Sequence, residues 1–261
     1  MLTEKQIEDF KHRGYFRVPG AFSRAEALEM EDAIWGALEK QGSVERQTPE
    51  TWTLTMGVGI SHLRSESAFQ IEENSVVMQA MAELFSDEKW VRPRDWGQLL
   101  VTFPGAEMVW DVPSEIWHSD FEYDAPPNRL FGLMIFSFLC DVEPKGGGTV
   151  VIDGSHRIVQ EFVKTQPPEI LKKMKLGRKA LFQSHPWLEA LTTQNEAQDR
   201  IERFMNTESE VFGVSASVNE LTGKAGDVIV CHPWILHAVA PNCGTRPRMM
   251  SVQRVRLAKQ E

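Results

Sequence analysis

Apolar and polar residues alternate with helical spacing at the start of the chain. Residues 3–6 and 23–26 each have the Ser/Thr-x-x-Glu/Gln spacing of a capping box, and each is followed by apolar residues three or four positions apart. The run YFRVPG between them has the composition of a short strand. We therefore expect a helix–strand–helix opening, whose two helices end near Gly14 and Gly42.

From residue 96 onward, the pattern changes to short β-branched or aromatic runs separated by Gly, Pro, Asn or Asp. The runs are WGQLLVTF, LFGLMIFSFLC, GTVVID, VFGVSASV, GDVIVC and RMMSVQRVRL. Their lengths and spacing favour a mainly β domain, either a sandwich or a rolled-up barrel, over alternating βαβ units. Before them, TWTLTMGVG is interpreted as a strand or a substrate-facing loop, and SVVMQAMAELFS predicts a short helix.

One segment interrupts the strand pattern. Residues 157–210 have a largely helical pattern, clearest in PPEILKKMKLG and NEAQDRIERFM. Because its apolar content looks low, we interpret the segment as an insertion between two strands rather than as a second domain. The expected organisation is a single domain over residues 1–261 with a helical insertion at about 157–210.

Composition and charge narrow the class of function. The chain has 261 residues, 42% of them hydrophobic, and a net charge of −9 without a basic block, which argues against nucleic-acid binding. No apolar run approaches the roughly 20 residues of a membrane span, and the charged N-terminus does not have a signal-peptide pattern. Three cysteines without CxxC spacing indicate reduced thiols. We expect a cytoplasmic protein that acts on a small molecule, with a homo-oligomer among the possible states.

Candidate metal ligands lie in the stretch WHSDFEYD. In an extended chain, His118 and Asp120 present an imidazole and a carboxylate on the same face. Two such ligands hold a divalent metal weakly, so a third is expected from elsewhere in the chain. Two histidines and one carboxylate occupy one face of an octahedron and leave positions open, an arrangement typical of non-haem Fe(II) oxygenases.

The third ligand is expected in AGDVIVCHPWILHAVAPNCGTRPR, which contains His232 and His237. Strand parity does not choose between them, because Pro233 interrupts the alternation. Arg248 follows His237 by eleven residues, and its guanidinium is suited to binding a carboxylate.

Three motifs, WHSD (117–120), GGGTVVIDGSH (146–156) and GDVIVCHPWILHAVAPNCGTRPR (226–248), resemble those of the phytanoyl-CoA dioxygenase family. The resemblance implies a double-stranded β-helix (jelly-roll or cupin-like barrel) and a dioxygenase that uses Fe(II), 2-oxoglutarate and O2. It implies that His118, Asp120 and His237 bind iron and that Arg248 binds the distal carboxylate of 2-oxoglutarate. His232 is then expected to be structural, and His156 is expected to bond to backbone.

The resemblance also implies the type of reaction. Such an enzyme oxidatively decarboxylates 2-oxoglutarate to succinate and CO2 and oxidises a C–H bond of its substrate. Related halogenases replace the carboxylate ligand with a small residue, so the retained Asp120 favours a hydroxylase-type enzyme. Val239 departs from the family pattern, which often has a small hydroxyl residue two positions after the distal histidine.

Further residues are weaker candidates. Gln98 is a candidate for cosubstrate binding, and Glu122, Trp117 and Trp234 are candidates for substrate binding, although a tryptophan beside a β-core is usually a packing residue. We expect oxidation of a small metabolite, in secondary or specialised metabolism. The alternatives are a cupin-type metalloenzyme that does not use 2-oxoglutarate and a non-catalytic binding protein on the same barrel.

Overall fold

The computed structural model describes residues 1–42, 44–53, 59–105, 108–194 and 199–258. Its larger sheet has five antiparallel strands in the order β1-β8-β3-β10-β2. The strands are β1 (Tyr15–Val18), β8 (Val228–Cys231), β3 (Gly132–Phe138), β10 (Arg248–Arg256) and β2 (Gln98–Thr102). They correspond to five of the apolar runs, and sequence-distant strands are neighbours throughout the sheet.

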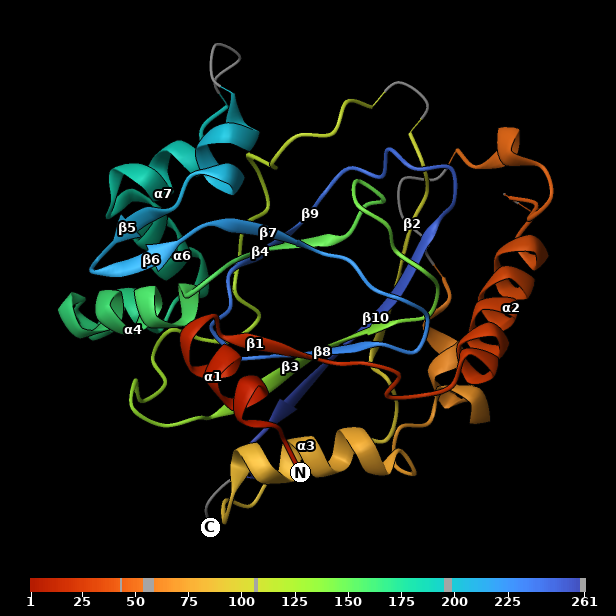
Figure 1. Cartoon of the computed structure of the whole chain (residues 1–261), viewed down its shortest axis with the longest axis horizontal. Helices are drawn as coiled ribbons and strands as arrows, with labels where there is room; N and C mark the ends of the chain where they lie inside the picture. Colours follow the sequence, from red (N-terminus) through yellow and green to blue (C-terminus); the bar gives the residue numbers. More distant parts are fainter. Residues whose placement is uncertain (43, 54–58, 106–107, 195–198, 259–261) are drawn as a thin grey trace.

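A smaller antiparallel sheet, β7 (Val218–Leu221), β4 (Thr149–Ile152) and β9 (His237–Val239), faces the larger one. Figure 1 shows the two sheets one above the other. Alternate side chains of both sheets fill the space between them, including Phe136, Val151 and Met250. This arrangement confirms the predicted mainly β fold of the jelly-roll type with flanking helices.

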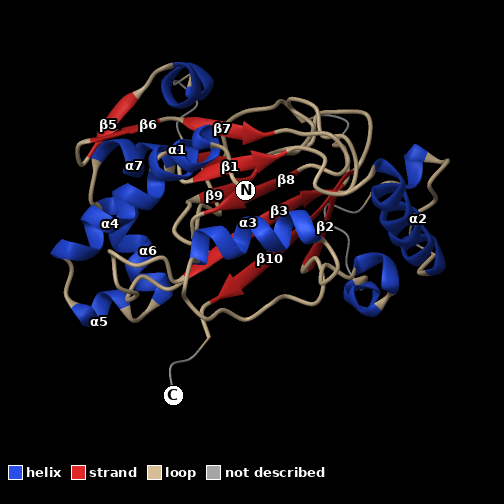
Figure 2. Ribbon diagram, turned by 60° about the horizontal axis from the view of Figure 1, so that its bottom comes forward, coloured by secondary structure: helices blue, strands red, loops and turns tan. Residues whose placement is uncertain are grey.

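Helices cover the outer face of the larger sheet. They are α1 (Glu4–His12), α2 (Arg24–Lys40) and α3 (Ser75–Phe85), with the short 3-10 helices η1 (Pro49–Thr51), η2 (Ser61–Ser65) and η3 (Ser67–Phe69). Both predicted capping boxes are present, and α3 lies across the sheet in Figure 2. The run TWTLTMGVG lies mostly outside the described residues. No helix in the described part of the chain is long and apolar enough to cross a membrane.

The segment between β4 and β5 packs on the outer face of the smaller sheet, to the left in Figure 1. It contains α4 (Ser155–Thr165), α5 (Pro168–Leu171), α6 (Met174–Gln183), α7 (Pro186–Leu191) and the π-helix η4 (Glu202–Asn206). Although apolar residues look sparse in this segment of the sequence, they are spread over several short helices and meet in one buried cluster. They include Ile158, Phe162, Leu181, Leu188 and Phe204, all fully or almost fully buried.

Two details of the helical segment differ from the sequence expectation. PPEILKKMKLG is not one helix, since α5 and α6 are separate, and the first part of NEAQDRIERFM lies outside the described residues. Arg200 is buried and donates to the carbonyls of Val112, Pro113 and Leu191. This guanidinium therefore ties the helical segment to the loop that leads into WHSD.

The run VFGVSASV is not one strand. It contains the turn between β5 (Ser209–Val211) and β6 (Val214–Ala216) and leads into β7. Phe212 and Gly213 form this turn with φ of 52° and 75°, the left-handed conformation that two-residue hairpin turns require. The sequence pattern missed the turn because only one of its two residues is glycine.

Candidate metal centre

His118 and His237 are brought together by a single antiparallel bridge rather than by a strand. The amide of His118 donates to the carbonyl of His237 at 3.0 Å, and the reverse bond is 2.9 Å. His237 is the first residue of β9 and pairs with Val151 of the neighbouring strand β4. The side chain of Val151 lies between the two sheets, and that of His237 lies on the same face. The two imidazole rings are 4.3 Å apart between centroids.

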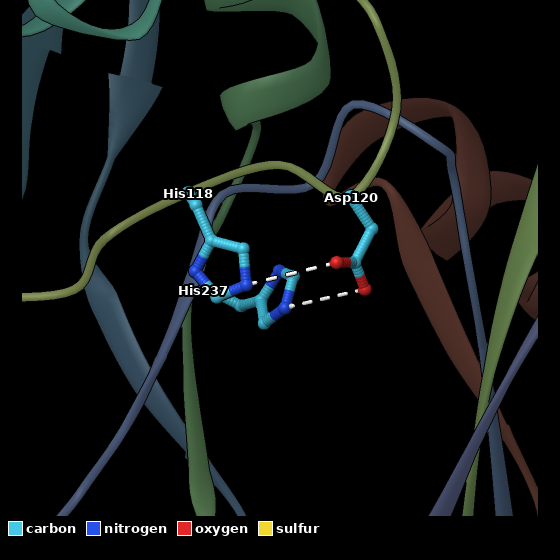
Figure 3. A group of neighbouring side chains, drawn as sticks. All are labelled: His118, Asp120 and His237. Carbon is cyan, nitrogen blue, oxygen red and sulfur yellow. Dashed lines mark ion pairs between the residues drawn. The ribbon is translucent and has the colours of Figure 1, made fainter. Parts of the chain in front are cut away.

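Asp120 completes the group from the same loop as His118. Its Oδ1 is 3.7 Å from Nε2 of His118, and its Oδ2 is 3.8 Å from Nε2 of His237. Figure 3 shows the three side chains directed toward one another. One candidate ligand atom from each residue lies within 4.8 Å of those of the other two. These separations are too long for hydrogen bonds and leave room for an ion. Two imidazoles and one carboxylate fit a divalent transition metal with open positions.

Backbone carbonyls orient both imidazoles. Nδ1 of His118 is 2.7 Å from the carbonyl of Ile116, and Nδ1 of His237 is 3.2 Å from the carbonyl of Ile235. Because a carbonyl oxygen only accepts, Nδ1 carries the proton in each ring and Nε2 is the free ligand atom. Ile116 has a φ of 62°, which is unusual for a β-branched residue.

Burial and a nearby cation shape the electrostatics of the group. Burial lowers the pKa of His237, which keeps its imidazole in the neutral form that binds metals. The guanidinium of Arg254, on β10, lies 2.9 Å from Oδ2 of Asp120. The carboxylate of Asp120 therefore lies between the candidate metal position and Arg254.

Arg248 lies at the other end of β10. Only 2% of its surface is exposed, and burial lowers its pKa to about 10, so it remains charged at neutral pH. Its Nη2 donates to the Thr102 hydroxyl at 2.7 Å and its Nη1 to the Met250 sulfur at 3.4 Å. Its Nε has no partner among the described residues. A buried cation without an anion is costly, so this position fits the carboxylate of a ligand.

Thr102 was missed by the sequence reasoning, which looked for a hydroxyl group near position 239. The structure has the exposed Val239 there and provides the hydroxyl from β2, directly opposite Arg248. Asn242 fixes this corner, because its side chain donates to the carbonyls of Thr102 and Arg246. The sequence could have indicated that Gln98, Leu100 and Thr102 share one face of a strand, because they are two positions apart. It does not show the register that pairs Thr102 with Arg248.

A cavity of about 950 Å³ lies between α2 and the loop that precedes β10. Its lining includes Arg248, Trp35 and Trp52, but none of the three candidate metal ligands. The cavity therefore reaches β10 at its first residue, Arg248. The candidate metal ligands lie further along the strand, where Asp120 contacts Arg254.

The sequence model described as phytanoyl-CoA dioxygenase (PhyH) matches residues 10–250. The chain belongs to the phytanoyl-CoA dioxygenase family. This confirms the resemblance that the three motifs carry. No curated protein sequence is significantly similar to the chain.

Solved structures share the fold of this family member. The non-haem alpha-ketoglutarate-dependent carbocyclase SnoK from nogalamycin biosynthesis is 18% identical with a TM-score of 0.53, covering 98% of this chain and 84% of that one. The epimerase SnoN, in complex with Fe3+, alpha-ketoglutarate and nogalamycin RO, is 16% identical with a TM-score of 0.54, covering 97% and 82%. At these identities, the likeness concerns the fold alone.

Of the other candidate residues, Gln98 lies near the candidate metal ligands, whereas Glu122 is held in an ion pair. Gln98 lies near the metal-binding group, since its Oε1 is 3.5 Å from Nη1 of Arg254. Glu122 forms a two-bond ion pair with Arg256, at 2.9 and 3.1 Å, which lowers the pKa of its carboxyl. The charge of Glu122 is therefore already paired with that of Arg256, which weakens its candidacy as a substrate-binding residue.

Trp117 and Trp234 are core side chains. The indole of Trp117 donates to the carbonyl of Pro113 at 2.7 Å, and that of Trp234 donates to the carbonyl of Glu122 at 2.8 Å. Both residues pack in the core beneath α4 to α7. With their polar atoms occupied and their rings buried, we do not propose them as substrate-binding residues.

Proposed function

We propose that the protein is an Fe(II)- and 2-oxoglutarate-dependent oxygenase. It oxidises a C–H bond of a small organic metabolite by a hydroxylase-type reaction, in secondary or specialised metabolism. His118, Asp120 and His237 bind the iron, and Arg248 binds the distal carboxylate of 2-oxoglutarate. The membership of the phytanoyl-CoA dioxygenase family and the grouping of the three ligands support the proposal.

The observation that carries the proposal is the state of Arg248. Its guanidinium is buried, charged and without a carboxylate partner among the described residues, and the Thr102 hydroxyl lies beside it. A dicarboxylate that reaches from the metal to this guanidinium supplies the missing anion. The two alternative functions do not by themselves require an anion at this position.

Each residue has a defined part in this proposal. When bound, iron and 2-oxoglutarate activate O2 and supply the oxidant, while the oxoacid is converted to succinate and CO2. His118 and His237 present Nε2 to the metal because the carbonyls of Ile116 and Ile235 hold their Nδ1 protons. Asp120 occupies the position that halogenases leave open for chloride, which supports a hydroxylase-type reaction.

The solved relatives support the metabolic setting more than the reaction. SnoK and SnoN are described as alpha-ketoglutarate-dependent or bound to alpha-ketoglutarate, and both act in the biosynthesis of nogalamycin. One is a carbocyclase and the other an epimerase, so the fold accommodates different outcomes of C–H oxidation. Hydroxylation therefore rests on the residues of this chain.

Anaerobic titration of the Fe(II)-loaded protein with 2-oxoglutarate tests the proposal. We expect a weak visible charge-transfer band in the parent protein and its loss in His237→Ala. Arg248→Ala should weaken 2-oxoglutarate binding by about 30-fold or more, because a buried ion pair is lost. Thr102→Val, a substitution of equal size, should weaken it by about fivefold, the value of one hydrogen bond.

The alternatives predict other results. Iron binding without a band would contradict the use of 2-oxoglutarate and favour a cupin-type metalloenzyme. Failure to bind Fe(II) at all would favour a non-catalytic binding protein. Circular dichroism of each variant shows whether the fold is retained, so that loss of structure is not mistaken for loss of a ligand.

A further inference from the structure

A second guanidinium faces the metal-binding group from β10. Arg248, Met250, Val252, Arg254 and Arg256 alternate along the inward side of this strand. Arg248 and Arg254 are six residues apart, which corresponds to about 20 Å along an extended chain. If Arg248 holds the distal carboxylate of 2-oxoglutarate, Arg254 is out of reach of that carboxylate. Arg254 is therefore not part of the site that binds this carboxylate.

The contacts of Arg254 leave part of its hydrogen-bonding capacity open. Its Nη2 lies 2.9 Å from Asp120, and its Nη1 is a marginal 3.5 Å from the Gln98 oxygen. A guanidinium has five N–H donors, and the side chain is 34% exposed, so solvent reaches it. By contrast, the neighbouring Arg256 forms a two-bond ion pair with Glu122.

The charge balance changes when a metal occupies the site. A divalent cation brings two positive charges, Asp120 neutralises one, and the oxoacid end of 2-oxoglutarate neutralises the other. Asp120 is then shared with the metal, and Arg254 remains as a positive charge in excess beside it. Among the described residues, no carboxylate other than that of Asp120 lies within ion-pair distance of Arg254.

From this geometry we propose that Arg254, assisted by Gln98, binds an anionic group of the substrate, so that the substrate is a carboxylate or a related oxyanion. The inference rests on the proposed function, because it needs a metal and 2-oxoglutarate in the site. Ile116, two positions before His118 in the chain, is 69% exposed, so the same loop carries an exposed apolar side chain. A short aliphatic acid is therefore a suitable probe.

The test compares hexanoate with hexanamide, which has the same length but no charge. The protein is loaded with Mn(II) and saturating 2-oxoglutarate, and the relaxation of probe protons by the paramagnetic ion reports binding close to the metal. We expect hexanoate to bind at least tenfold more tightly than hexanamide. Arg254→Gln should remove this difference, and Arg254→Lys should retain part of it.

Arg129→Gln is the matched control. Arg129 lies on the loop before β3 and forms an exposed two-bond ion pair with Glu88, so the substitution removes a guanidinium away from the site. It should behave as the parent protein. Equal binding of the two probes, or a preference for hexanoate that survives Arg254→Gln, would overturn the inference. A fall in Mn(II) affinity in Arg254→Gln with unchanged hexanoate preference would also overturn it, and would make Arg254 a positioning residue for Asp120.

The loading step separates the two proposals. The electron paramagnetic resonance signal of free Mn(II) measures metal binding before any probe is added. If the parent protein does not bind Mn(II) and 2-oxoglutarate, the proposed function fails and the inference falls with it. If both bind but hexanoate has no advantage, only the inference fails.

Discussion

At the scale of single residues, Ile116 adopts a left-handed backbone conformation two positions before His118. This conformation directs its carbonyl to Nδ1 of His118, while its side chain is 69% exposed. A left-handed conformation costs a non-glycine residue about 1–2 kcal/mol. The strain is therefore located where it orients a candidate metal ligand.

Ile116→Gly should relieve this strain and keep the carbonyl in place. We expect the free energy of unfolding to rise by about 0.5–1 kcal/mol, because the relief exceeds the extra backbone entropy that glycine adds to the unfolded chain. Ile116→Ala is the control, since it removes the same side chain but keeps the strain. Urea unfolding of both variants measures the difference, and a glycine variant less stable than the alanine variant would contradict this reading.

The sequence predicted the candidate site in part. His118 and Asp120 were visible as a local motif, whereas His237 and Arg248 were assigned only through the family resemblance. Thr102 and Arg254 were missed, because their roles depend on which residues face each other across β2, β10 and the WHSD loop. Strand register of this kind is fixed by the whole fold and not by any short run of residues.

At the scale of elements, two buried histidines connect α1, α4 and the turn between β8 and β9. Nε2 of His156 donates to the carbonyl of Lys11, and the amide of His232 donates to the carbonyl of Gly14. The rings are 4.9 Å apart, and a side chain at Gly14 would collide with His156. Both histidines are therefore structural, as expected from the sequence.

This junction should make the fold sensitive to acid. Burial lowers the pKa of His156 to about 4 and also lowers that of His232, whereas unfolding returns both to an ordinary value near 6.5. The unfolded chain thus binds protons first, and stability present above pH 6.5 is lost as the pH falls toward 4. His156 alone should contribute about 2 kcal/mol to the loss between pH 7 and pH 5.

His156→Gln tests the contribution of this histidine, because the amide keeps a donor for the Lys11 carbonyl but does not titrate. The free energy of unfolding of the metal-free variant, measured by urea at pH 7 and pH 5, should depend less on pH than that of the parent. The difference in pH dependence between parent and variant gives the contribution of His156 separately from that of the other histidines. An unchanged pH dependence would show that His156 does not remain neutral in the folded chain.

At the scale of the whole molecule, the candidate metal ligands and Arg248 lie toward opposite ends of one strand, β10. The strand runs and the helix–strand–helix opening were predicted from periodicity, because half-buried strands and amphipathic helices leave clear patterns. The core beneath α4 to α7 was not predicted, since its residues come from short helices that each look polar. Arg200 connects this core to the loop that leads into WHSD by donating to the carbonyls of Val112 and Pro113, a contact that the sequence does not indicate.

The proposed function requires this family member to couple iron to the oxidative decarboxylation of 2-oxoglutarate. The most direct measurement is succinate formed from 2-oxoglutarate by the Fe(II)-loaded protein in air, followed overnight without added substrate. We predict succinate in proportion to the O2 consumed, at a slow uncoupled rate, and none from His237→Ala or under anaerobic conditions. Fe(II)-loaded parent protein that binds the metal yet forms no succinate would contradict the claim.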